Sequence, residues 1–198
     1  MIKIKMCGLR RETDIEYANK LLPEYIGYVF AEKSRRYITP EKAGKLTDLL
    51  NKKIVPVGVF VNLPVKDVIR LIKSGTIKIA QLHGNEDDEY ISELHAENIT
   101  VIKAFIVKSE NDIEIANNST ADYILLDAGM GDGKTFNYNL LENIRRPYFL
   151  AGGLTPENIA NAVNLTPYAV DVSSGIETNG FKDFTKMKKF TDTIRKDL

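Results

Sequence analysis

The sequence predicts a (β/α)8 barrel, in which eight parallel strands close into a ring and helices surround them. Short apolar runs alternate eight times with stretches that carry helix-start signals, and this alternation implies parallel strands joined by right-handed crossovers. The seventh and eighth runs both end in loops of small residues, which suits the phosphate-binding end of such a barrel. A doubly wound open sheet is the alternative, but no G-x-G-x-x-G motif follows the first strand.

Each strand is predicted from a short run of apolar and β-branched residues, as buried parallel strands require. The predicted strands are residues 2–6, 25–30, 55–61, 77–82, 100–104, 123–126, 149–151 and 169–172. Helices are expected after three caps, namely Thr13 or Asp14, Ser109 and Thr155, and after Pro64. Others are expected to start at Pro40, in residues 85–88 and at Asn139, and a last one covers residues 183–196. This last helix carries one apolar stripe, so we expect it to pack against another element; the stripe is Phe184, Met187, Phe190 and Ile194.

Size and composition are those of an ordinary globular protein. The 198 residues suffice for one domain, residues 1–198, which would bury roughly 70% of the unfolded surface. Hydrophobic residues make up 43% of the chain and charged residues 27%, which is typical of globular domains. The 27 basic and 27 acidic residues cancel, so we expect neither nucleic acid nor a membrane as a partner. The sequence does not distinguish a monomer from a homodimer.

The single cysteine and the apolar segments indicate a cytoplasmic protein. One cysteine excludes an intramolecular disulfide. The N-terminus lacks the apolar core of a signal peptide. The most apolar region, residues 54–65, is interrupted by prolines and a glycine and is too short for a membrane span, which needs about 20 apolar residues.

Two loops of small residues predict a phosphate site. They are Gly152-Gly153 and Ser173-Ser174-Gly175, and each is expected to enter a helix. For the first of these helices Thr155 is the expected N-cap and Pro156 the first helical residue. Glycine lets the backbone approach a ligand, and helix N-termini present unpaired N–H groups to an anion. A glycine can also simply end a strand, but two such loops in succession favour phosphate.

Cys7 and Asp127 are the candidate acid–base groups, because each follows a predicted strand and would lie at the same mouth of the barrel. Cys7 could equally be an inert buried thiol. Lys5 points to the same side of its strand, and a nearby ammonium group would favour the thiolate. Asp127 could instead cap its loop, but shielding by Phe136 or Tyr138 would raise its pKa and let it donate a proton.

Other polar residues near the strand ends are candidates for binding substrate. Gln81 and His83 alternate along one strand end, and either could bind hydroxyl groups, although a lone histidine is more often structural. The residues Lys33, Ser34, Arg35 and Arg36 form a positive run that could bind a carboxylate. We also expect Lys5, Lys103 and Asp171 to form a charge network inside the barrel, with Asp171 as a further candidate for binding substrate.

Several other chemistries lack the residues that they need. The two histidines, His83 at a strand end and His95 in a helix, do not provide the clustered ligands that a zinc site needs. We find no Walker loop and no Ser-His-Asp order. The sequence therefore predicts no metal.

Nine segments in order make the chain similar to the phosphoribosylanthranilate isomerase family of tryptophan biosynthesis. They are KMCG (5–8), GYVF (27–30), KSRRYITP (33–40), VGVFVN (57–62), QLHG (81–84), LLD (125–127), GDGKTF (131–136), AGGLTPEN (151–158) and VDVSSGIE (170–177). Each falls at a predicted strand or strand end, and together they cover nearly the whole chain.

The resemblance implies an Amadori rearrangement of an aminoaldose to an aminoketose. It implies that Asp127 is the acid, Cys7 the base, and Arg36 the clamp for the anthranilate carboxylate. The phosphate is expected on a set of loop residues, namely Gly152, Gly153, Ser174 and Gly175. No cofactor is implied, because the imine formed on ring opening is itself the electron sink.

Three departures from the family pattern touch the expected site. Arg35 stands where proline is usual, Asp132 where a small residue is usual, and Asn137-Tyr138 where Asp-Trp is frequent. Other phosphosugar barrels remain as alternatives, but an epimerase would need metal-binding histidines and the histidine-pathway isomerase an aspartate in place of Cys7. A phosphosugar-binding module without activity is a further alternative, and it would have no need of an acid–base pair.

Overall fold

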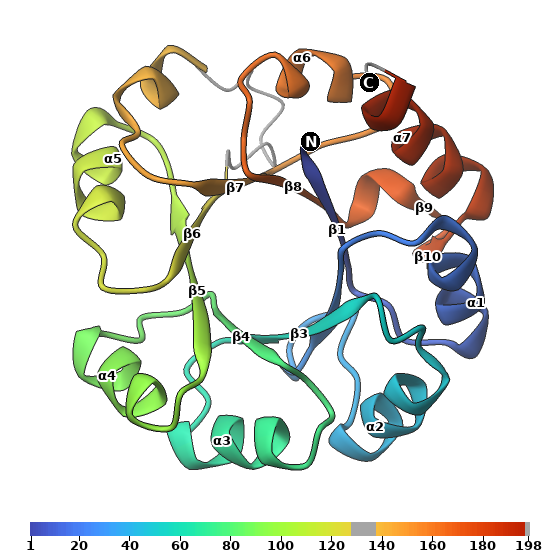
Figure 1. Ribbon diagram of the computed structural model, residues 1–198, viewed down its shortest axis with the longest axis horizontal. Helices are drawn as coiled ribbons and strands as arrows, with labels where there is room; N and C mark the ends of the chain where they lie inside the picture. Colours follow the sequence, from blue (N-terminus) through green and yellow to red (C-terminus); the bar gives the residue numbers. More distant parts are fainter. Residues whose placement is uncertain (128–137, 197–198) are drawn as a thin grey trace.

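Eight parallel strands close into a barrel in the computed structural model, which describes residues 1–127 and 138–196. The strands follow the chain order around the ring (Figure 1). They are β1 Lys3–Cys7, β2 Tyr25–Val29, β3 Val55–Phe60, β4 Ile79–Leu82, β5 Thr100–Ile106, β6 Tyr123–Asp127, β7 Tyr148–Ala151 and β8 Ala169–Val172. Because β1 pairs with both β2 and β8, the sheet has no open edge. The predicted (β/α)8 barrel is confirmed.

Helices form a ring outside the strands (Figure 1). They are α1 Glu12–Leu21, α2 Pro40–Leu49, α3 Val65–Lys73, α4 Asp88–Ala96, α5 Glu110–Asn117, α6 Ile159–Val163 and α7 Phe184–Lys196, with short 3-10 helices η2 Tyr138–Asn143 and η3 Ser174–Ile176. Three residues of the predicted stripe on α7, Met187, Phe190 and Ile194, are buried. None of the helices in the described part of the chain is long and apolar enough to cross a membrane.

Strand alternation divides the core into two layers. Ile4 and Met6 of β1 belong to the outer layer between strands and helices, whereas Val57, Leu125 and Phe149 pack with one another inside the barrel. The same alternation therefore turns Lys5 and Cys7 of β1 toward the inside. Polar side chains lie at both ends of the barrel, because Lys3 and Tyr168 hydrogen-bond where the strands begin and the residues predicted for the site lie where the strands end.

Helix α1 begins earlier, and helix α6 begins later, than the sequence predicted. Helix α1 starts at Glu12, and Asp14 acts from its first turn by accepting hydrogen bonds from the backbone N–H groups of Arg10 and Arg11 at 2.9 and 3.1 Å. Helix α6 starts at Ile159 with Asn158 at the N-cap position, so the prediction of Thr155 as N-cap is wrong.

The Asn158 side chain gives the physical reason for the late start of α6. Its Oδ1 accepts from the N–H of Thr155 at 2.8 Å, and its Nδ2 donates to the carbonyl of Gly153 at 2.9 Å. These local bonds hold the chain in a turn before the helix begins.

An antiparallel hairpin between β8 and α7 was not predicted. Its strands are β9 Glu177–Thr178 and β10 Phe181–Lys182, and they are joined by Asn179 and Gly180. Both joining residues have positive φ, 53° and 78°, as two-residue Asn-Gly turns require. The loop after β8 therefore enters the 3-10 helix η3 and this hairpin, and not the α-helix that we expected.

Candidate active site

A cavity of about 420 Å³ lies at the carboxyl ends of the strands, where (β/α)8 barrels carry their chemistry. Nearly all the residues that were predicted from the sequence as catalytic or substrate-binding line this cavity. They are Cys7, Arg36, Gln81, His83, Asp127, Gly152, Gly153, Asp171 and Ser174. Gly175 is the nominated residue that does not line this cavity.

Cys7 is the last residue of β1, and its thiol is packed against Val29 and Val59. Gly27 is its register partner on β2, and a Cβ atom there would lie 2.7 Å from the Cys7 sulfur. Gly27 thus makes room for the thiol. Burial raises the pKa of Cys7 above its ordinary value, and the charge of Lys5 opposes this only in part. As expected, the charge of Lys5 lowers the pKa of Cys7 and so favours the thiolate, but the effect of burial on this pKa is larger.

Lys5 lies fully buried below Cys7 and pairs with Asp171 of β8 at 2.9 Å. Burial acts to lower the pKa of Lys5, but the charges of Asp171 and Cys7 outweigh burial and raise it. Lys5 therefore remains an ammonium group. This part of the predicted internal network is confirmed.

Lys103 does not belong to this network. Its neighbours Ile102 and Ala104 face the barrel interior, so Lys103 points outward from β5. There it pairs with Glu86 at 3.0 Å and donates to the carbonyl of Gly84 at 2.8 Å. The prediction was wrong about Lys103 because strand parity places it among the helices.

Two buried acceptor atoms in the cavity wall have no partner within the described residues. They are Oε1 of Gln81 and Oδ1 of Asp171. A buried acceptor without a hydrogen bond costs about 1–3 kcal/mol, so these atoms favour a ligand that brings hydroxyl or N–H donors. Gln81 is 1% exposed and Asp171 9%, which leaves the cavity side as the direction from which donors can arrive.

Asp127 ends β6 and lies beside His83, which follows β4. The distance from Asp127 Oδ2 to His83 Nε2 is 3.7 Å, and both side chains are about one-third exposed or less. Asp127 and Cys7 line the same cavity from strands that are separated by β7 and β8 around the ring. The predicted shielding of Asp127 concerns the side chains of Phe136 and Tyr138, which lie outside the described part of the structure, as do Asp132 and Asn137.

The two small-residue loops touch each other. A Cβ atom on Gly175 would lie 1.9 Å from the carbonyl oxygen of Leu154, so the loop after β8 packs backbone to backbone on the loop after β7. Gly152 and Gly153 have φ of 97° and 59°, which other residues adopt only with strain. Gly175 therefore joins the loops, while Gly152, Gly153 and Ser174 form the cavity surface.

Arg36 reaches the cavity from the loop after β2 and pairs with Glu177 of the hairpin. Its Nε donates to Glu177 Oε1 at 2.7 Å and its Nη2 to Oε2 at 2.8 Å. Lys182 Nζ donates to Oε1 at 2.8 Å, and Arg35 Nη2 to Oε2 at 3.2 Å. Burial alone would raise the pKa of Glu177, but the hydrogen bonds from Arg36 and Lys182 outweigh it and lower the pKa to about 2.

A family model described as N-(5'-phosphoribosyl)anthranilate (PRA) isomerase matches residues 4–193. The chain belongs to the PRA isomerase family. The enzyme named N-(5'-phosphoribosyl)anthranilate isomerase from Thermoanaerobacter sp. strain X514 is 45% identical over 203 residues, and the match covers 98% of each chain.

Solved PRA isomerase structures have the same fold over their full length. One contains reduced 1-(o-carboxyphenylamino)-1-deoxyribulose 5-phosphate and is 36% identical, with a TM-score of 0.88 and complete coverage of both chains. Monomers generated from the dimeric enzyme of Thermotoga maritima are also 36% identical, with a TM-score of 0.86 and complete coverage of both chains. Both the recognised family and the barrel are thereby confirmed.

Two residues around this PRA isomerase cavity, Glu177 and Lys182, were not predicted from the sequence. Glu177 closes the VDVSSGIE segment and was given no role, because no sequence signal links it to Arg36, which is 141 positions away. Ser173 belongs to the predicted phosphate loop and lines the cavity, and its hydroxyl also donates to the carbonyl of Cys7 at 3.1 Å. Lys182 is 4% exposed and donates to the carbonyl of Ser173 at 2.9 Å, but nothing in its sequence context marks it.

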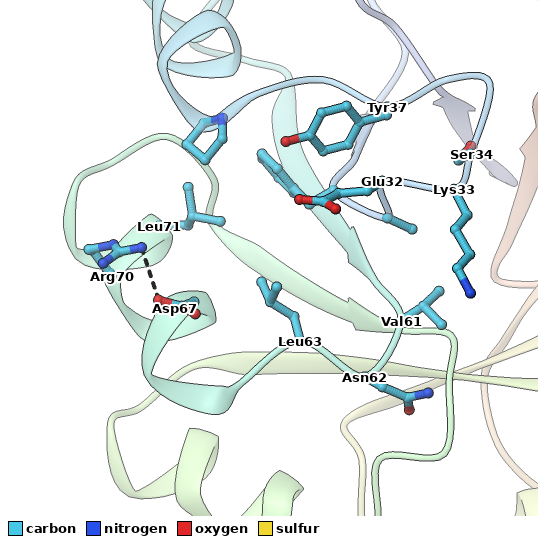
Figure 2. Close-up of a pocket in the computed structure, with 13 residues that line it drawn as sticks. Glu32, Lys33, Ser34, Tyr37, Val61, Asn62, Leu63, Asp67, Arg70 and Leu71 are labelled. Carbon is cyan, nitrogen blue, oxygen red and sulfur yellow. Dashed lines mark ion pairs between the residues drawn. The ribbon is translucent and has the colours of Figure 1, made fainter.

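A larger hollow of about 800 Å³ adjoins the cavity between the loops after β2 and β3. Figure 2 shows Glu32, Tyr37 and Leu63 in its wall. Two of its charged residues, Asp67 and Arg70, pair with each other at 2.9 Å (Figure 2). The smaller cavity is the candidate active site because it contains the thiol, the carboxyl group and the glycine loops.

Proposed function

We propose that this protein is an isomerase that converts N-(5'-phosphoribosyl)anthranilate into 1-(2-carboxyphenylamino)-1-deoxy-D-ribulose 5-phosphate, the third step of tryptophan synthesis from chorismate. One observation carries the assignment of roles: a single cavity is lined by Cys7, Asp127, Arg36 and the glycine loop after β7. An acid, a base and anchors for both ends of a substrate that carries a carboxylate and a phosphate are what this reaction needs.

The reaction requires one proton donor and one proton acceptor. Asp127 in its protonated form gives a proton to the furanose ring oxygen, and the ring opens to a Schiff base between C1′ and the anthranilate nitrogen. Cys7 as a thiolate then takes the proton from C2′, and the electron pair moves toward the iminium nitrogen to give an enolamine. Tautomerisation of the enolamine gives the ketone. The iminium group accepts the electrons, so we expect no cofactor.

Lys5 supports Cys7 as the base. The thiolate is disfavoured by burial, and the Lys5 ammonium is the largest of the effects that oppose burial. Asp171 keeps Lys5 charged and in place through the 2.9 Å ion pair. In this proposal the pair therefore increases the fraction of Cys7 that is thiolate, although it does not touch the reacting carbon.

The remaining cavity residues bind the substrate. Gln81 and Asp171 each offer a buried acceptor without a partner in the described part of the chain, which fits sugar hydroxyl groups as donors. His83 lies beside Asp127 and is placed to contact the opening sugar. The phosphate group of the substrate binds to Gly152, Gly153 and Ser174.

Other features of the protein follow from this function. We expect one catalytic domain over residues 1–198 that acts in the cytoplasm as a monomer or homodimer. Its partner is the small phosphosugar substrate, with no role for nucleic acid or a membrane.

Turnover of the aminoaldose by the purified protein tests the proposal. The substrate carries the fluorescent anthranilate group, and its fluorescence falls as it is consumed. A protein that binds the reduced aminoketose product but does not consume the substrate would be a binding module and not an isomerase.

A further inference from the structure

We propose that Glu177 is a positioning residue that holds Arg36 in the orientation needed to bind the substrate carboxylate. The inference rests on the proposed function, in which Arg36 contacts the anthranilate carboxylate. Glu177 itself touches no reacting atom. It acts through one edge of the Arg36 guanidinium group, and the other edge serves the substrate.

The pairing geometry separates these two edges. A guanidinium group can bind a carboxylate along its Nε–Nη2 edge or along its Nη1–Nη2 edge. Glu177 occupies the first edge with bonds of 2.7 and 2.8 Å. Within the described residues no partner is bound to Nη1, so the second edge of Arg36 is available, and Arg36 lines the cavity.

Charge in the cluster favours a second carboxylate. Glu177 is surrounded by Arg35, Arg36 and Lys182, all within 3.2 Å of its oxygens. Three cations face one carboxylate, so the cluster retains positive charge after Glu177 has paired. Glu177 therefore orients Arg36 without neutralising it, and the substrate carboxylate still meets a positive site.

The surroundings of Glu177 fix its own position. Its side chain is 5% exposed, and it stands at the start of the β9–β10 hairpin. Lys182 pairs with it from the facing strand and also donates to the carbonyl of Ser173 in the cavity wall. Lys186 donates to the Glu177 backbone carbonyl at 2.7 Å. The hairpin thus ties the carboxylate to the loop after β8.

Gly8 also confines Arg36. A Cβ atom on Gly8 would lie 2.4 Å from Arg36 Cδ, and Gly8 has φ of 82°. The aliphatic part of Arg36 therefore lies directly on the backbone that follows Cys7. Contacts with Gly8 and Glu177 hold Arg36 before substrate arrives, and this reduces the ordering cost of binding.

Substitution of Glu177 by glutamine tests the inference, because the amide keeps the size but cannot accept both bonds. We expect Glu177→Gln to raise KM, and the Kd of the reduced aminoketose product, about tenfold, with kcat changed less than about threefold. For N-(5'-phosphoribosyl)aniline, which lacks the carboxylate, KM should change less than about twofold. Glu177→Asp, which retains the charge, should recover part of the loss.

A double-mutant cycle with Arg36→Met separates positioning from general damage. If Glu177 acts through Arg36, Arg36→Met/Glu177→Gln should bind the product analogue no more weakly than Arg36→Met alone. The matched control is Glu114→Gln, which weakens an exposed ion pair outside the cavity, in which Arg145 Nη2 donates to both carboxylate oxygens of Glu114, and it should change neither constant.

Additive losses in the cycle, or a fall in kcat at unchanged KM, would overturn the positioning role. Thermal unfolding of each variant shows whether the fold is retained, and Glu177→Ala serves if Glu177→Gln does not fold. A wild-type protein without turnover would contradict the proposed function. The Kd cycle needs no turnover, so it would still decide whether Glu177 acts through Arg36.

Discussion

The Nζ atom of Lys5 lies 2.9 Å from Oδ2 of Asp171 across the β1–β8 junction. Lys5 is two residues before Cys7 on β1. This buried pair places the positive charge of Lys5 next to the proposed base, Cys7, and pairs that charge with the carboxylate of Asp171. The chemistry at Cys7 therefore depends on residues that do not reach the substrate carbon.

Removal of this pair should shift the pH dependence of activity. Lys5 lowers the pKa of Cys7 against the larger effect of burial, and a base must be deprotonated to act. We expect Lys5→Met/Asp171→Asn to move the acid limb of the kcat/KM profile to higher pH, so that activity at neutral pH falls. The double variant avoids leaving Asp171 as a buried unpaired charge. An unchanged acid limb would show that Lys5 does not control the ionisation of Cys7.

Replacement of either acid–base group should lower turnover. Cys7→Ala and Asp127→Asn are each expected to reduce kcat by at least about 100-fold, the usual scale for groups that transfer protons. Cys7→Ser should also be weak, because a hydroxyl group is a far poorer base than a thiolate near neutral pH. Steady-state kinetics measure these effects, and a near-normal kcat in either variant would remove that residue from its role.

Glycine-to-alanine changes in the paired loops should mainly weaken substrate binding. In Gly175→Ala the new methyl group would meet the Leu154 carbonyl at 1.9 Å, so the two loops must separate. Gly153→Ala adds strain at a φ of 59°. We expect KM to rise in both variants with a smaller effect on kcat. Gly44→Ala in α2 is the control, because its nearest neighbour would be 3.5 Å away. A loss of kcat at constant KM would show that these loops do more than hold the phosphate.

The Glu177 cluster should contribute to stability in a pH-dependent way. The pKa of Glu177 is lowered to about 2 from an ordinary 4.5, so the folded state binds this proton less readily than the unfolded state. Its contribution, roughly 3 kcal/mol, is present above pH 4.5 and is lost as the pH falls toward 2.

Denaturant unfolding of Glu177→Gln at several pH values tests this contribution. The variant should be less stable than the wild type at pH 6, and the gap in the free energy of unfolding should narrow between pH 4.5 and 2. A gap that stays constant over this range would show that ionisation of Glu177 does not stabilise the fold.

The strands and the cavity residues were predictable because they follow from local pattern and chain order. Alternation placed Lys5 and Cys7 on one side of β1, and strand ends in a closed barrel meet at one mouth. The same alternation turns Lys103 away from the inward-facing Ile102 and outward to Glu86.

The loops were harder to predict because side-chain hydrogen bonds decide their paths, and these bonds are local at Asn158 but long-range at Glu177. Asn158 delays α6 by bonding to Thr155 and Gly153, and this bonding competes with strong helix-start signals. The Asn179-Gly180 dipeptide is a local hairpin signal, and both residues have the positive φ that a two-residue turn requires. Glu177 and Arg36 are 141 positions apart, so their pairing appears only once the barrel has closed.

The most direct test is to mix the purified protein with N-(5'-phosphoribosyl)anthranilate and follow anthranilate fluorescence, with Cys7→Ala in parallel. The account predicts a rapid loss of fluorescence with the wild type, formation of the aminoketose, and at least about 100-fold slower loss with Cys7→Ala. Binding of the reduced product without consumption of the substrate, or equal rates for both proteins, would contradict it.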